Sequence, residues 1–119
     1  MHGRALAAEA LRVDLTAEAA ALRATELWRS RGHVAKTLIK YADLRVVLMV
    51  FRAGARLHEH VAEERIALQT VSGHVRLTSP AGTFDLPSGH LLTLDHAVPH
   101  DVEAIDESTL LLFLSAPED

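Results

Sequence analysis

The feature that most constrains the fold is a series of short apolar segments separated by glycine and proline. The segment 44–52 is almost entirely apolar, which is typical of a strand buried on both faces. Many short strands at regular spacing with such breaks indicate a β-sandwich or β-barrel. The sequence therefore predicts an all-β domain with strands at 34–40, 44–52, 56–61, 65–71, 74–79, 83–86, 91–94, 102–105 and 109–114.

The first 31 residues differ from the rest, because they are rich in the good helix formers Ala, Leu, Glu and Arg. Thr16 can cap a helix over residues 17–31, with Glu18 in its first turn and Gly32 just past its end. Residues 4–12 form either a second short helix or an irregular lead. We expect the helix to lie on the outside of the β domain, and we divide the chain into an N-terminal helical segment, 1–33, and a β domain, 34–119.

Composition excludes several classes of protein. The 119 residues carry a formal net charge of −4 and few aromatic side chains, which argues against binding of nucleic acid. The chain has no cysteine, and therefore no disulfide, thiolate nucleophile or cysteine-based zinc site. No apolar run approaches the ~20 residues needed to span a membrane, and we expect a cytoplasmic location because no signal-peptide pattern is present.

Histidine is frequent, with eight residues, and its arrangement predicts a site. His58 and His60 alternate on an expected strand, so both imidazoles would face the same side. Glu64 follows four residues later, and His100 could close the site from a distant strand. Two or three imidazoles with one carboxylate form a ligand set for a divalent transition metal. If these groups do not converge, the chain is a small β-domain without visible chemistry.

Two segments resemble the conserved motifs of the cupin family. Residues 54–73 resemble the first motif, in which a glycine is followed by an H-x-H pair, a glutamate and a second glycine. Residues 89–104 resemble the second motif, which contains a glycine and one later histidine, here Gly89 and His100. The resemblance covers about residues 35–115 and implies a cupin-type jelly-roll β-barrel, here with an N-terminal α-helix.

The chain departs from both motifs. In the second, Asp95, Ala97 and Ala104 replace the usual Pro, Gly and Asn. In the first, Glu64 has the family spacing from His60, but counting back from Gly73 places Ile66 at the carboxylate position. A bulge or a longer hairpin tip could return Glu64 to the site. The sequence leaves both alignments open.

The resemblance implies a metal site inside the barrel. His58, His60, Glu64 and His100 would be the ligands of a divalent transition metal, Fe, Mn, Ni, Co, Cu or Zn, which need not be present in this chain. His96, on the loop that enters the barrel mouth, would bind substrate.

Two functions follow from the resemblance. The first is a metal-dependent enzyme, an oxygenase or isomerase, that acts on a small organic molecule. The alternative is a non-catalytic module, with or without a metal, that binds or senses a small-molecule ligand. The family also implies a homodimer. No nucleophile elbow and no phosphate-binding loop occur in the sequence.

Overall fold

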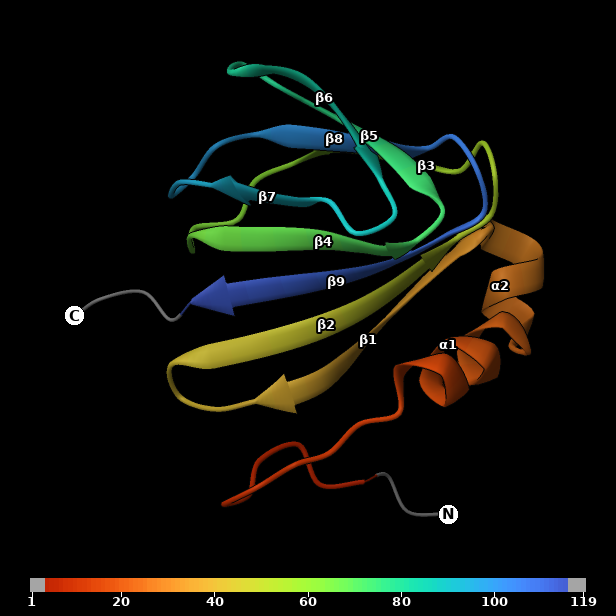
Figure 1. The fold of residues 1–119 in the computed structure, drawn as a ribbon, viewed down its shortest axis with the longest axis vertical. Helices are drawn as coiled ribbons and strands as arrows, with labels where there is room; N and C mark the ends of the chain where they lie inside the picture. Colours follow the sequence, from red (N-terminus) through yellow and green to blue (C-terminus); the bar gives the residue numbers. More distant parts are fainter. Residues whose placement is uncertain (1–3, 116–119) are drawn as a thin grey trace.

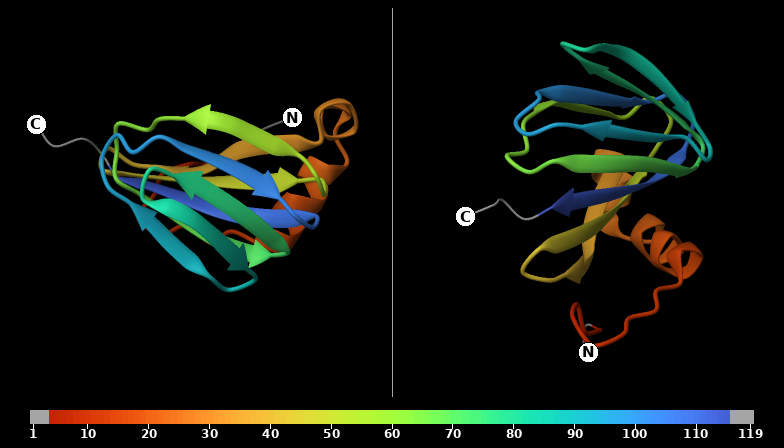
Figure 2. Two further views of the ribbon diagram at one scale, coloured as in Figure 1. Left: turned by 90° about the horizontal axis from the view of Figure 1, so that it is seen from above. Right: turned by 60° about the vertical axis from the view of Figure 1, so that its left-hand side comes forward.

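The structure, a computed structural model that describes residues 4–115, contains two antiparallel sheets with two helices on one side (Figure 1). One sheet has the strand order β1-β2-β9-β4-β7, and the other has the order β3-β8-β5-β6. The strands are β1 (His33–Lys40), β2 (Leu44–Phe51), β3 (Arg56–His60), β4 (Ile66–Ser72), β5 (His74–Ser79), β6 (Gly82–Pro87), β7 (Leu91–Leu94), β8 (His100–Ala104) and β9 (Ser108–Ser115). The predicted all-β jelly-roll is confirmed, with the two sheets facing each other and not closing into a continuous barrel (Figure 2).

The N-terminal helical region forms two helices, α1 (Leu15–Arg23) and α2 (Glu26–Arg31), rather than one. Asp14 caps α1 by accepting a hydrogen bond of 3.1 Å from the Ala17 amide, so the predicted Thr16 cap is wrong. Thr25 interrupts the helix because its hydroxyl accepts from the Trp28 amide at 3.2 Å and caps α2. The predicted end at Gly32 is confirmed, with φ of 78°. No helix within residues 4–115 is long and apolar enough to cross a membrane.

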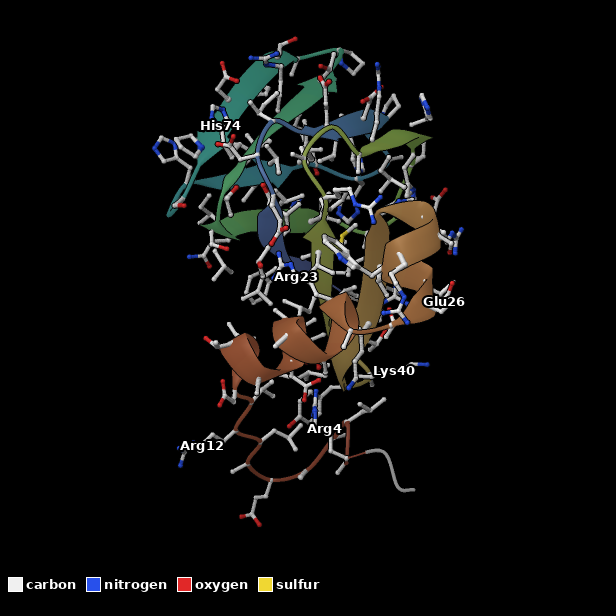
Figure 3. The ribbon with its side chains drawn as sticks, turned by 90° about the vertical axis from the view of Figure 1, so that its right-hand side faces the viewer. Arg4, Arg12, Arg23, Glu26, Lys40 and His74 are labelled. Carbon is white, nitrogen blue, oxygen red and sulfur yellow. The ribbon has the colours of Figure 1, made fainter. Side chains whose placement is uncertain are left out.

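Residues 4–12 are an irregular lead that runs beside the end of β1. The Lys40 amide donates to the Leu6 carbonyl at 2.8 Å, and the Tyr41 hydroxyl donates to the Ala8 carbonyl at 2.6 Å. Arg4 donates to the Leu38 carbonyl and lies between the lead and β1 (Figure 3). The lead therefore covers part of the outer edge of β1.

The main core lies between the two sheets and comes from the inward side of each strand. Phe51, Val75, Leu77 and Leu110 are fully buried there. A second core lies on the outer face of the five-stranded sheet, under the helices. Its buried members are Ala19, Leu22, Val34, Leu38, Val46, Leu48, Val50 and Leu111. Strand β2 supplies both cores, which confirms that its apolar run is buried on both faces.

Arg23 joins α1 to the five-stranded sheet. Its guanidinium donates to the Ser108 carbonyl and the Thr109 hydroxyl, both at 3.0 Å, and lies 5.4 Å from the centre of the Trp28 ring. Figure 3 shows Arg23 at this junction. These contacts, together with an ion pair of 3.1 Å between Arg23 Nε and Glu107, hold α1 against the sheet.

Gly73 sets the turn from β4 to β5. Its φ is 93°, and a Cβ at this position would lie 2.3 Å from the Glu107 carbonyl oxygen and 2.7 Å from Ser108 Cα. No other residue type fits this close approach of two backbones. The turn fixes the end of β4, whose first residue, Ile66, pairs with Leu114 of β9.

Candidate functional site

A cavity of about 670 Å³ lies between the two sheets. Strands β1, β2, β4 and β9 form one wall, β3 and β8 form the other, and Leu27 and Arg31 of α2 complete the lining. Most of the wall is apolar. The polar lining residues are Arg31, His33, Thr37, Arg45, His60, Glu63, Glu64 and His100. The size and composition are those of a site for a small organic molecule.

His60 and His100 meet at the cavity, as the sequence predicts. They occupy paired positions on β3 and β8, and their rings are stacked with centroids 5.7 Å apart and planes 9° apart. His100 is buried, and its Nδ1 lies 3.1 Å from the Val98 carbonyl oxygen. A carbonyl only accepts, so Nδ1 carries a proton, and when the ring is neutral its lone pair lies on Nε2.

His58 does not line the cavity, which differs from the expected shared face with His60. Leu57 pairs with Val102 and His60 pairs with His100, so β3 has one residue more than β8 between these pairs. This bulge brings both Leu57 and His60 to the cavity and leaves His58 on the other side of the strand. The alternation rule fails at the bulge because it assumes a regular strand.

The outer side of this bulge carries an ion pair. Arg56 donates to the Asp101 carboxylate, at 2.7 Å for the shortest contact, and this hydrogen bond holds the pKa of Asp101 below its usual value. The charge of Arg56 acts in the same direction, as do His58 and His100 when they are protonated, while partial burial opposes this. His58 thus belongs electrostatically to the Arg56–Asp101 pair.

Glu64 lines the cavity but is directed toward an arginine. Its Oε2 lies 3.8 Å from Nη2 of Arg45. Ile66, the position obtained by counting back from Gly73, is buried and also lines the cavity. Both alignments of the first motif therefore reach the cavity, one with a carboxylate just before β4 and one with an apolar side chain on β4.

His96 lies on an exposed loop, outside the cavity wall. Its Nδ1 is 3.1 Å from the Glu63 carbonyl oxygen, and the next residue, Ala97, donates its amide to the Ala62 carbonyl at 3.0 Å. These contacts hold the loop that precedes β8 against the loop that follows β3. His96 therefore takes part in the contact between these two loops and does not reach the predicted substrate site.

The donor set was compared with the needs of a divalent metal. Two imidazole nitrogens on one metal lie at most ~4.2 Å apart, because each bond is about 2.1 Å. The ring centroids of His60 and His100 lie 5.7 Å apart, and this separation does not exclude a shared metal, because each centroid lies farther from the metal than its ligating nitrogen. Among the side chains that the structure describes within residues 4–115, no group of three or more His, Asp or Glu is arranged to hold a metal ion. As they lie, these residues do not fit a cupin metal centre.

Arg45 is a site residue that the sequence reasoning missed. It faces the cavity from β2, on the same side as Val47 and Met49. The available signal was a charged residue inside an otherwise apolar strand, at even spacing from inward-facing positions. Arg31 and His33 also line the cavity, but no pattern in the sequence distinguished them from surface residues.

Comparison with known proteins was informative only at the level of structure. No family model and no curated protein matches the sequence. A conserved protein of unknown function from Streptococcus pyogenes matches with a TM-score of 0.75 and 21% identity, over 100% of this chain and 98% of that one. An RmlC-like cupin from Desulfovibrio desulfuricans matches with a TM-score of 0.67 and 18% identity, over 99% and 100%.

A third match is a larger enzyme. The oxalate decarboxylase of Lactobacillus farciminis, in complex with formate, has a TM-score of 0.66 and 25% identity, over 76% of this chain and 30% of that one. The shared part is thus the jelly-roll alone. The fold of this chain is therefore the fold of small RmlC-like cupins.

Proposed function

We propose that this chain is a small-molecule-binding cupin whose ligand lies in the cavity between the two sheets. The observation that carries the proposal is the cavity of about 670 Å³, which has a mostly apolar wall and polar lining groups that include His60 and His100. Sites for small molecules have this volume and this balance of apolar surface and oriented polar groups. The proposal needs no metal.

The chain's own residues would orient the ligand. Val98 fixes the tautomer of His100, so Nε2 of the neutral ring accepts a hydrogen bond from a hydroxyl or amide of the ligand. His60 lies beside it as a second imidazole. The apolar wall excludes water from the rest of the ligand, which strengthens these polar contacts.

Binding can be tested with a fragment library and ¹H–¹⁵N NMR spectra of the full chain. Fragments should shift resonances of cavity residues, and His100→Ala should weaken this binding by about tenfold, as expected for one lost buried hydrogen bond. His90→Ala, which changes an exposed histidine outside the cavity wall, is the control and should bind like the wild type. The proposal fails if no fragment shifts cavity resonances or if His100→Ala binds unchanged.

A metal-dependent enzyme is the second candidate, because His60, His100 and Glu64 line one cavity. For these three residues to hold a metal, Glu64 would have to leave Arg45. Elemental analysis of protein purified without a histidine tag decides this. About one equivalent of a transition metal, lost in His100→Ala, would support the candidate. A content far below one equivalent, unrestored by dialysis against metal, would exclude it.

A homodimer is also proposed. The sheets end in the unclosed edges β1 and β7 of one sheet and β3 and β6 of the other, and such edges are usually covered. The lead covers only the end of the β1 edge. Sedimentation equilibrium should give twice the mass of one chain, and the mass of a single chain would contradict a dimer.

A further inference from the structure

Arg45 faces the cavity from the row of residues in which the cupin pattern expects the carboxylate. It pairs with Leu114, which in turn pairs with Ile66, so the three residues lie side by side across β2, β9 and β4. Directly paired residues of a sheet share a face, and all three line the cavity. In this row the charged group is therefore a guanidinium, and the carboxylate position obtained by counting back from Gly73 is the apolar Ile66.

The hydrogen-bond donors of Arg45 are not used within the part of the chain that the structure describes. Its contact with Glu64 is 3.8 Å, which is too long for a hydrogen bond. Arg56, by comparison, reaches Asp101 at 2.7 Å. Arg45 thus presents a planar fork of donors, and carboxylates match this fork with two parallel hydrogen bonds.

The remaining wall restricts what else the ligand contains. Val47, Met49, Leu57 and Leu112 form apolar surface near Arg45 and the histidines. Nε2 of neutral His100 offers a lone pair and needs a donor. Arg31 also lines the cavity, but a free phosphate would gain nothing from the apolar wall. A carboxylate attached to an apolar body fits both features.

We infer that the cavity takes a small organic acid, with its carboxylate on Arg45, its apolar body against the wall and a hydroxyl or amide donor at His100. This inference rests on the proposed function, since it names the class of ligand for the same cavity. Glu64 competes with the ligand for Arg45. Arg45 is therefore the residue that selects acids over neutral molecules of the same shape.

The test uses straight-chain and aryl monocarboxylic acids, their 2-hydroxy derivatives and the primary amide of each acid. Binding to the full chain is measured by ¹H–¹⁵N NMR titration near neutral pH. The acids should bind more tightly than their amides, and a 2-hydroxy group should add affinity that His100→Ala removes. Arg45→Gln should weaken the acids about tenfold and leave the amides unchanged, because a charge-assisted hydrogen bond is lost.

Two further variants complete the test. Glu64→Gln should tighten the acids, since the competing carboxylate is gone; a merely structural Arg45–Glu64 pair would not produce this gain. Arg76→Gln is the matched control, because Arg76 has the same side-chain exposure, 43%, and lies outside the cavity wall. Equal binding of acids and amides, or of Arg45→Gln and wild type to the acids, would overturn the inference while leaving cavity binding intact. Absence of binding by acids and amides alike would overturn both.

Discussion

The two faces of β2 differ in how completely they are filled. On the outer face, Val46, Leu48 and Val50 are buried against α1 and the neighbouring strands. On the inner face, Arg45, Val47 and Met49 border a cavity of about 670 Å³. One apolar strand thus contributes to a closed core on one side, whereas on the other side only Phe51 is fully buried and these three residues border the cavity. The comparison indicates that the outer face mainly stabilises the fold, whereas the inner face leaves room for a ligand.

The largest expected effect is on the free energy of unfolding, when valine is replaced by alanine on each face of β2 in turn. Val50→Ala should lower the free energy of unfolding by about 2–3 kcal/mol, because it opens a cavity in a fully packed core. Val47→Ala should lower it by about 1 kcal/mol or less, because Val47 already borders open space. Urea denaturation of both variants measures the difference. Equal losses would contradict the distinction between the faces.

The two faces of β3 provide a second comparison. His60→Ala should weaken binding of cavity ligands several-fold, because His60 lies beside His100. His58→Ala should leave the affinity unchanged, since the bulge keeps His58 out of the cavity wall. NMR titration of the two variants compares them directly. A larger loss in His58→Ala than in His60→Ala would show that the bulge is absent in solution.

Acid pH should weaken the contact between α1 and β1 on the outer face, and so lower the stability of the fold. Lys36 donates to Glu18 at 2.7 Å and holds the pKa of Glu18 below its ordinary value of 4.5; partial burial opposes this, and the charges of Lys36 and Arg4 support it. The unfolded chain then binds the proton more readily, so the stabilisation is present above pH 4.5 and is lost as the pH falls below it.

As the pH falls, the free energy of unfolding should decrease by up to about 1 kcal/mol less in Glu18→Gln than in the wild type. The free energy of unfolding, measured by urea denaturation in steps from neutral to about pH 3, gives the slope. Glu9→Gln, an exposed carboxylate on the lead, is the control and should keep the slope of the wild type. An unchanged slope in Glu18→Gln would contradict this role.

The smallest effect concerns the loop before β8. Ala97 has φ of 56°, a left-handed conformation that glycine adopts without strain, and it stands where the cupin pattern has glycine. Ala97→Gly should raise stability by roughly 0.5 kcal/mol, because relief of strain exceeds the added entropy of the unfolded chain. A melting temperature below that of the wild type would contradict this.

Most strands were predictable because their signals are local. Glycine and proline breaks bound each strand, and the observed strands agree with the expected ones within a few residues at their ends. The helix was harder, since Thr25 acts as a cap through a hydrogen bond that helix propensity does not represent. The placement of His100 followed from its spacing to Gly89, and the structure puts its ring in the cavity wall.

The sequence by itself determined the β class, the apolar strand with two buried faces and the candidate role of His60 and His100. Only the tertiary structure decided the rest of the site. The bulge in β3 turned His58 away, and the register of β2, β9 and β4 placed Arg45 in one row with Ile66. The reason is physical: alternation along a strand is local, whereas bulges and register depend on the partner strand, which lies far away in the sequence.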